Sequence, residues 1–313
     1  MKKVSALPTL ITLGNLLSGF AAITFAMRAA SVTSIARIGR TLEGLLSSEL
    51  EFFYNNILCA SLLIGLAMLC DLFDGRVARV TKSTSRFGEE MDSLADLVSF
   101  GVAPAFIVKV LIDAHGFPRY YGWVLVAVFV ACGALRLARY NVESAGESSE
   151  IFNGLPIPAA AGAAVSWVVL WHALAAGELK DLIVGGRSLS WLIAYALPFY
   201  VFALGPLMTS RVRYLHLGKK LLKGEKTFPQ LVGIVLVIAL LALQPEVMVA
   251  LAFNAYAVAG LVSEAIRLSA RARRRSASLG SSGGKPPDDA DADDGSAPAA
   301  EAPDDLRDIA NRN

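Results

Sequence analysis

Four aspartates in one short stretch of the chain are the residues best suited to chemistry: Asp71, Asp74, Asp92 and Asp96. If the flanking segments are helices, the first pair has a spacing of three residues and the second a spacing of four, so each pair shares one helix face. Each pair lies at the end of an apolar stretch of membrane length, where a carboxylate is costly unless it has a functional partner. Four converging carboxylates, with Arg76 and Arg79 between them, indicate a site for divalent metal and phosphate, and their number favours two ions. The alternative is a set of helix-end acids that reach water, which suits Asp71 alone.

The aspartates belong to a longer pattern, Asp-x-x-Asp-Gly-x-x-Ala-Arg, then eight residues, then Gly-x-x-x-Asp-x-x-x-Asp. Its fixed positions are Asp71, Asp74, Gly75, Ala78, Arg79, Gly88, Asp92 and Asp96. With every position matched, the sequence resembles the CDP-alcohol phosphotransferases, integral membrane enzymes of phospholipid synthesis. The resemblance implies that Asp71, Asp74 and Asp92 bind Mg²⁺ or Mn²⁺. It also implies that Asp96 is the general base for the attacking hydroxyl and a further candidate metal ligand.

Candidate nucleotide- and phosphate-binding residues surround the aspartates. Gly75 and Ala78 carry little side-chain bulk and allow a nucleotide to approach the backbone, and Arg79 offers guanidinium donors that match phosphate oxygens. Gly88 allows a neighbouring helix or a ligand to come close, with simple helix packing as the alternative. Thr12 and Asn15, with Ser18, form a polar stripe in the first apolar segment. This stripe either faces the four acids or makes ordinary hydrogen bonds between helices.

The composition predicts an all-α, polytopic membrane helix bundle. The chain has 313 residues, of which 55% are hydrophobic and 18% charged, and its mean hydropathy is +0.53. Soluble chains usually carry about 25% charged residues. The net charge of +2 gives no indication of nucleic-acid binding, and the three cysteines lie in apolar runs as expected of small buried side chains. We therefore expect a membrane protein with lipid around it.

About eight transmembrane helices are expected in a membrane domain that covers residues 1–270. Their approximate ranges are 7–27, 52–71, 88–113, 121–137, 154–176, 190–208, 228–243 and 247–268. The first is long enough to be a retained span rather than a cleaved signal peptide. The polar connection at 29–50 predicts an amphipathic helix that lies at the membrane interface. Residues 271–313 contain too few apolar side chains to fold and are expected to be a disordered tail.

Basic residues cluster on one set of helix ends, which predicts the orientation of the bundle. Eight spans place both termini on one side, and that side carries Lys2, Lys3, Arg136, Arg139 and the basic loop at 211–226. By the positive-inside rule this side is cytoplasmic. The four acids then lie at the cytoplasmic surface of the inner membrane, within reach of soluble substrates.

Several further segments are similar to those of the membrane-bound phosphatidylserine synthases. These residues are Pro8, Thr12, Asn15 and Gly19, together with the segments Asp92–Asp96, Phe100–Pro104, Arg136–Asn141 and Gly154–Pro158. The similarity implies transfer of a phosphatidyl group from CDP-diacylglycerol to L-serine, with release of CMP. Zwitterionic serine needs a cation for its carboxylate, which Arg136, Arg139 or Arg211 could supply, and neutral contacts that Asn141 and Ser93 could supply. The two arginines of the 136–141 segment have an alternative role as basic residues that close a helix on the cytoplasmic side.

Two other functions stay open at this point. Another CDP-alcohol phosphotransferase would use glycerol phosphate, inositol phosphate or choline as the acceptor. A cation transporter would use the four acids as an ion site, but the sequence shows no convincing repeat and the acids lie at helix ends. Whether the protein forms a homodimer is also left open.

Overall fold

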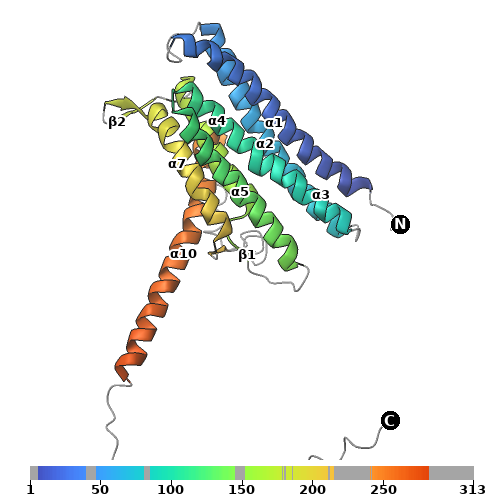
Figure 1. Cartoon of the computed structure of the whole chain (residues 1–313), viewed down its shortest axis with the longest axis vertical. Coiled ribbons are helices and arrows are strands. Elements are labelled where there is room, and N and C mark those ends of the chain that lie inside the picture. Colours follow the sequence, from blue (N-terminus) through green and yellow to red (C-terminus); the bar gives the residue numbers. More distant parts are fainter. Residues whose placement is uncertain are drawn as a thin grey trace, which may run out of the picture. The chain divides into compact units, whose positions relative to one another are not determined.

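A computed structural model gives the fold as a bundle of long helices with two small two-stranded sheets (Figure 1). It describes residues 6–281 except 40–46, 81–84, 145–151, 178, 180, 185, 211, 215–239 and 241. The helices are α1 (Ala6–Gly39), α2 (Ser47–Val80), α3 (Arg86–Asp96), η2 (Leu97–Val102), α4 (Ala103–Ala114), α5 (Arg119–Ser144), α6 (Ile157–Ala175), α7 (Leu189–Thr209) and α10 (Pro245–Ser281). The strands are β1 (Phe152–Asn153), β2 (Ile183–Val184), β3 (Arg187–Ser188) and β4 (Arg213–Tyr214).

Seven helical segments in the described part of the chain are long and apolar enough to cross a membrane. They are Pro8–Val32, Ser47–Val77, Phe87–Ala114, Arg119–Val142, Ile157–Ala175, Leu189–Thr209 and Pro245–Arg267. Large apolar side chains such as Leu10, Leu17 and Phe20 are more than 60% exposed on α1, as expected of a surface that faces lipid. The predicted all-α polytopic membrane bundle is confirmed. The further span predicted at 228–243 lies almost entirely outside the described residues.

Two predicted boundaries are corrected. The interfacial helix expected at 29–50 is wrong as drawn, because α1 continues without a break to Gly39 and α2 already begins at Ser47. The disorder predicted from residue 271 is wrong for the first part of that segment, because α10 extends to Ser281. Packing divides the chain into two units, Met1–Arg267 and Leu268–Asn313.

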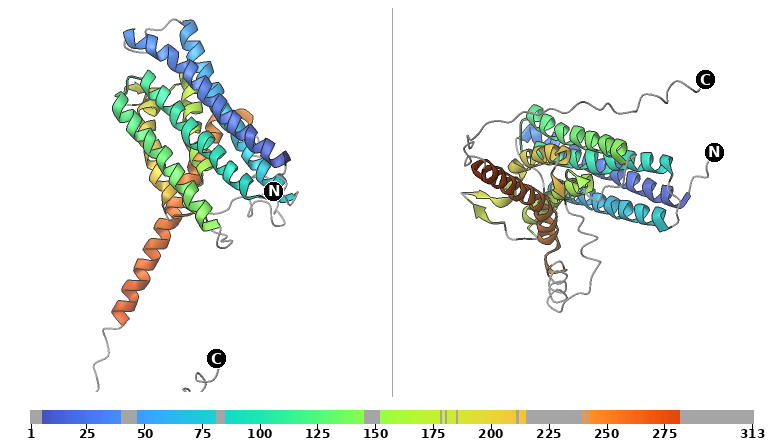
Figure 2. Two further views of the ribbon diagram at one scale, coloured as in Figure 1. Left: turned by 45° about the vertical axis from the view of Figure 1, so that its right-hand side comes forward. Right: turned by 90° about the horizontal axis from the view of Figure 1, so that it is seen from below.

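Small residues allow α1 to pack closely along α2. Ala22, Ala26 and Ala29 recur on one face of α1 and are fully buried, as are Phe53 and Ile57 on α2. In a membrane, helices associate mainly through such close packing, which small side chains permit. Figures 1 and 2 show the two helices side by side, with the third span along α1. Helix α1 therefore contacts both of the segments that carry the acid pairs.

The third span is not a uniform α-helix. It consists of α3, the π-helical segment η2 and α4, and Ser99, Phe100 and Gly101 in the π segment are buried. The span begins at Ser85, whose hydroxyl accepts a hydrogen bond of 3.1 Å from the Gly88 amide. π-turns are concentrated at functional sites. The π segment directly after Asp96 therefore marks this part of the span as a candidate functional site.

A small sheet joins the segment just before the fifth span to the segment just after the sixth. Strands β1 and β4 pair antiparallel, with Phe152 opposite Tyr214. Gly154 follows with a φ of +88°, and a Cβ there would overlap the Met208 carbonyl oxygen. Only glycine fits this turn, which fixes the entry of α6 against the end of α7.

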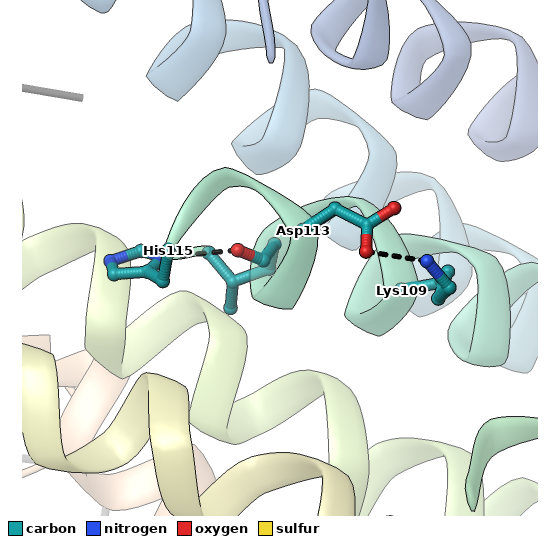
Figure 3. Close-up of polar contacts among 4 residues, drawn as sticks. Lys109, Asp113 and His115 are labelled. Atoms are coloured by element: carbon teal, nitrogen blue, oxygen red, sulfur yellow. Dashed lines mark hydrogen bonds and ion pairs between the residues drawn. The ribbon is translucent and has the colours of Figure 1, made fainter. Parts of the chain in front are cut away.

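A second pair of charges lies in the far half of the third span. Lys109 donates to Asp113 one turn later, and the two side chains are only about 15% exposed (Figure 3). The pair keeps both charges neutralised inside the membrane. Just beyond it, burial lowers the pKa of His115, whose Nδ1–H donates to the Leu111 carbonyl oxygen at 2.9 Å. These residues close the end of α4 opposite to the four aspartates.

Candidate active site

Three of the four aspartates meet at one point. Asp71 and Asp74 lie in the last turns of α2 and Asp92 lies on α3, and carboxylate oxygens of all three lie within 4.8 Å of one another. Asp74 is 5% exposed and the other two are half-buried. Like charges at this separation in partly apolar surroundings repel strongly. The cluster is therefore stable as three carboxylates only when a cation compensates them.

The oxygen atoms themselves fit a divalent cation. Asp74 Oδ2 and Asp92 Oδ1 are buried and find no hydrogen-bond partner among the residues that the structure describes. An unpaired buried carboxylate oxygen carries a large desolvation penalty. Mg²⁺ and Mn²⁺ prefer oxygen ligands of this kind. The donor set therefore matches the metal that the sequence pattern implies.

The fourth aspartate is held separately. Asp96 is 8% exposed and accepts a hydrogen bond of 3.0 Å from Asn15 Nδ2 on α1, so one carboxylate oxygen is fixed by an amide. The Asn15 backbone carbonyl in turn accepts a 2.9 Å hydrogen bond from Ser99 Oγ in η2. Asn15 is fully buried. Helix α1 thus orients Asp96 while leaving its second oxygen for another partner.

Two glycines bring α1 close to both acid-bearing segments. A Cβ on Gly14 would lie 3.5 Å from Cys70 Sγ, directly before Asp71. A Cβ on Gly19 would overlap Ser99 Oγ and lie 2.7 Å from Ser99 Cα. The polar stripe lies on the same part of α1. The Thr12 hydroxyl lies beside Asp74 and donates to the Pro8 carbonyl oxygen at 3.1 Å. Ser18 is different, since it bonds back to Gly14 of its own helix.

Gly19→Ala is expected to destabilise the protein, because the new methyl group meets backbone atoms that cannot move aside. Overpacking of this kind costs about 1–3 kcal/mol. Thermal unfolding in detergent should show a clearly lower melting temperature for this variant. Gly65→Ala on α2 is the matched control, since nothing lies within 4 Å of the added Cβ. Equal melting temperatures for the two variants would contradict the close contact between α1 and η2.

The predicted phosphate-binding residues are placed only in part. Gly75 is exposed and a Cβ there would meet nothing within 4 Å, so no close approach within the described structure requires glycine at this position. Gly88 serves local packing, because its Cβ position lies 3.2 Å from the capping Ser85 hydroxyl. Ala78 and Arg79 lie in the last turn of α2, but their side chains are outside the described part of the chain. Their roles, like those of Thr12 and Asn15 toward a nucleotide, stay predictions.

The predicted acceptor-binding residues differ in their hydrogen-bond partners and in their electrostatic interactions. Ser93 donates to Asn141 Oδ1 at 3.1 Å, so these two neutral groups hold each other across α3 and α5. Arg136 is half-buried and interacts electrostatically with Asp96, and its Nε has no hydrogen-bond partner among the described residues. Arg139 already interacts within the chain. Arg211 lies outside the described residues. Arg136 is therefore the candidate cation that interacts with one of the four acids, Asp96.

One neighbour of the site was not predicted from the sequence. Tyr256 on α10 interacts electrostatically with Arg136, although it lies 120 residues further along the chain. A lone tyrosine in an apolar run gives no local signal of this contact. The spacing within α10 does not indicate it either.

The structure is thus a polytopic helix bundle with a carboxylate cluster at the adjoining ends of two spans, and the oxygen donors of this cluster suit a divalent cation. The family model described as CDP-alcohol phosphatidyltransferase matches residues 5–202, which is more than half of the sequence. The chain belongs to this family.

Curated relatives agree with this assignment. The CDP-diacylglycerol–serine O-phosphatidyltransferase of Helicobacter pylori strain J99 is 36% identical over 185 residues, which cover 57% of this chain and 71% of the relative. The protein of the same name in Saccharomyces cerevisiae is 46% identical over 106 residues, or 32% of this chain and 37% of that protein. That of Methanocaldococcus jannaschii is 37% identical over 123 residues, or 39% and 57%.

Proposed function

We propose that the protein transfers the phosphatidyl group of CDP-diacylglycerol to the hydroxyl group of L-serine and releases CMP. The names of its relatives support this reaction. The observation that carries it is the electrostatic interaction of a half-buried arginine, Arg136, with Asp96, the candidate base. An acceptor with both a hydroxyl and a carboxylate fits a site with a carboxylate base and a neighbouring guanidinium.

Asp71, Asp74 and Asp92 would hold Mg²⁺ or Mn²⁺, with two ions as the proposal for a four-acid site. The chemistry supplied by an ion held there would be neutralisation of the substrate phosphates and polarisation of the phosphorus that is attacked. The backbone at Gly75, next to Asp74, is exposed, and it is the proposed point of approach for the phosphates. The protein contributes three carboxylate oxygens from two helices, which it holds within 4.8 Å of one another.

Asp96 would take the proton from the serine hydroxyl as attack proceeds. Asn15 holds one of its oxygens, which leaves the other to accept the proton. The serine oxygen then forms a bond to the phosphorus of the phosphatidyl group, and the bond from that phosphorus to the CMP oxygen breaks. CMP leaves with the bonding electron pair, and Asp96 retains the proton until it passes to solvent.

The proposed location is the inner membrane, with both termini and the site on the cytoplasmic side. The ends of α2 and α5 on the side of the acids carry three basic residues, Arg76, Arg136 and Arg139. This excess of positive charge supports the orientation. CDP-diacylglycerol would enter from the bilayer and serine from the cytosol. Residues 1–270 form the proposed catalytic domain, because they include all four aspartates, Arg136 and Tyr256.

Purified protein in mixed micelles with CDP-diacylglycerol and Mg²⁺ or Mn²⁺ should release CMP only when L-serine is added. A chelator should abolish the release, and added metal should restore it. Glycerol phosphate, inositol phosphate and choline are the comparison acceptors. Release that depends on one of these and not on serine would refute the proposed acceptor while leaving the family chemistry intact.

A further inference from the structure

Helix α10 is tied into the bundle at one polar residue. Asn254 Oδ1 accepts hydrogen bonds from Trp167 Nε1, at 3.0 Å, and from the Tyr200 hydroxyl. Asn254 Nδ2 donates to Ser166 Oγ at 3.2 Å and to the Ala250 carbonyl at 2.7 Å. The amide therefore uses all of its hydrogen-bonding capacity. Bonds of this kind between α6, α7 and α10 fix the rotation of α10 about its own axis.

Tyr256 follows two residues later and is held by a second contact. Its ring packs against the ring of Tyr214 on β4, with the centroids 5.4 Å apart. Tyr214 is itself buried against α10, because its hydroxyl donates to the Ala257 carbonyl at 3.2 Å and Gly260 leaves space for its ring. Burial, with Tyr256 and Tyr200 nearby, raises the pKa of Tyr214 to about 12, so this hydroxyl stays a donor. The position of the Tyr256 side chain is thus set from two sides.

Tyr256 also lies within electrostatic range of Arg136 in the candidate active site. Arg136 interacts electrostatically with Tyr256, with Tyr140 and with Asp96. The guanidinium makes no ion pair with Asp96 within 4.0 Å in the part of the chain that the structure describes, and its buried Nε lacks a partner there. A buried guanidinium donor without an acceptor is costly. An anionic ligand that bridges this region would satisfy it.

We propose that Tyr256 on α10 forms, together with Arg136, the subsite that holds the carboxylate of the amino-acid acceptor. This inference rests on the proposed function. A carboxylate accepts hydrogen bonds from a guanidinium and a phenol at once. The Asn254 hydrogen bonds hold α10, which carries the phenol, against α6 and α7. In serine the hydroxyl and the carboxylate are only a few bonds apart. A carboxylate held at Arg136 therefore brings the hydroxyl toward Asp96.

The assignment gives α10 a role in acceptor selection, although it lies beyond the residues 5–202 that match the family model. The matched region supplies the acids that any family member needs for the phosphate chemistry. A residue outside it can then distinguish one acceptor alcohol from another without altering that chemistry.

The test is Tyr256→Phe, which removes the hydroxyl and keeps the ring against Tyr214. Serine-dependent CMP release should show a KM for serine that is raised roughly tenfold or more, as expected for a lost hydrogen bond to a charged group. The kcat should stay within about twofold, and so should the KM for CDP-diacylglycerol. Tyr195→Phe is the matched control, because it removes a half-buried phenol that donates to the His115 carbonyl at the opposite end of the bundle. That variant should keep the wild-type KM for serine.

An unchanged KM for serine in Tyr256→Phe would overturn the assignment. So would equal changes in kcat and in both KM values, together with a lower melting temperature, since these indicate a structural role only. If the wild-type protein does not use serine at all, the proposed function fails, and the carboxylate subsite fails with it. Failure of the subsite alone leaves serine-dependent release by the wild-type protein intact.

Discussion

Asp74→Asn is expected to reduce turnover to less than about one-thousandth of the wild-type rate, because metal stabilisation of phosphate charge supplies several kcal/mol of the barrier reduction. The substitution removes an anionic ligand whose Oδ2 is buried without a hydrogen-bond partner in the described structure. Asp71→Asn and Asp92→Asn should have the same effect, since their oxygens complete the same cluster. Each variant should still insert and fold, because the asparagine keeps the shape of the side chain.

The direct measurement is metal binding by the purified variants, followed with Mn²⁺ by its spin resonance signal alongside CMP release. Glu89→Gln is the matched control, because this exposed carboxylate lies on α3, one turn before Asp92. It should retain both metal binding and turnover. Substantial activity of any of the three cluster variants at ordinary metal concentration would contradict the site as described.

Asp96→Asn should separate chemistry from binding. The asparagine can still accept the hydrogen bond from Asn15 through its amide oxygen, so the local structure is kept. It cannot take a proton from the serine hydroxyl, and general-base catalysis contributes roughly 10²–10⁴-fold in rate. We therefore expect kcat to fall by that factor while CDP-diacylglycerol and metal still bind.

Nucleotide-lipid binding and serine-dependent CMP release should both be measured on this variant. The control is Asn15→Ala, which removes the partner that orients Asp96 but leaves its carboxylate in place. It should lower kcat less than Asp96→Asn does. If Asp96→Asn loses metal and nucleotide altogether, Asp96 is chiefly a metal ligand and the base lies elsewhere.

The acid cluster could be predicted from the sequence because it depends on local spacing. Asp71 and Asp74 share a helix face, and so do Asp92 and Asp96, whatever the rest of the chain does. Their convergence followed from a recognised pattern and from the cost of carboxylates near a membrane. The composition was equally sufficient for the membrane bundle, because apolar runs of spanning length have few other stable arrangements.

The partners of these residues could not be predicted, because they are decided by contacts between distant segments. The hydrogen bond from Asn15 to Asp96 joins residues 81 positions apart, and the bond from Ser99 to Asn15 joins residues 84 apart. The stripe of Thr12 and Asn15 was a candidate either for the acids or for helix packing, and in the structure it serves both. The sequence did not predict that α1 continues to Gly39. The apolar periodicity beyond residue 29 is the same whether these residues extend the first helix or form a separate one.

The π-helical segment η2 has a consequence for how this active site is specified. The amide of Ala103 bonds to the carbonyl of Val98, five residues back, so the span contains one residue more than a regular helix of the same length. Each residue of an α-helix advances the azimuth by about 100°. The acids of α3 therefore point in a direction that differs by roughly this angle from the one an unbroken extension of α4 would give them. A protein could carry every letter of the aspartate motif and still aim Asp92 and Asp96 at lipid, if its span lacked the inserted residue between 97 and 102.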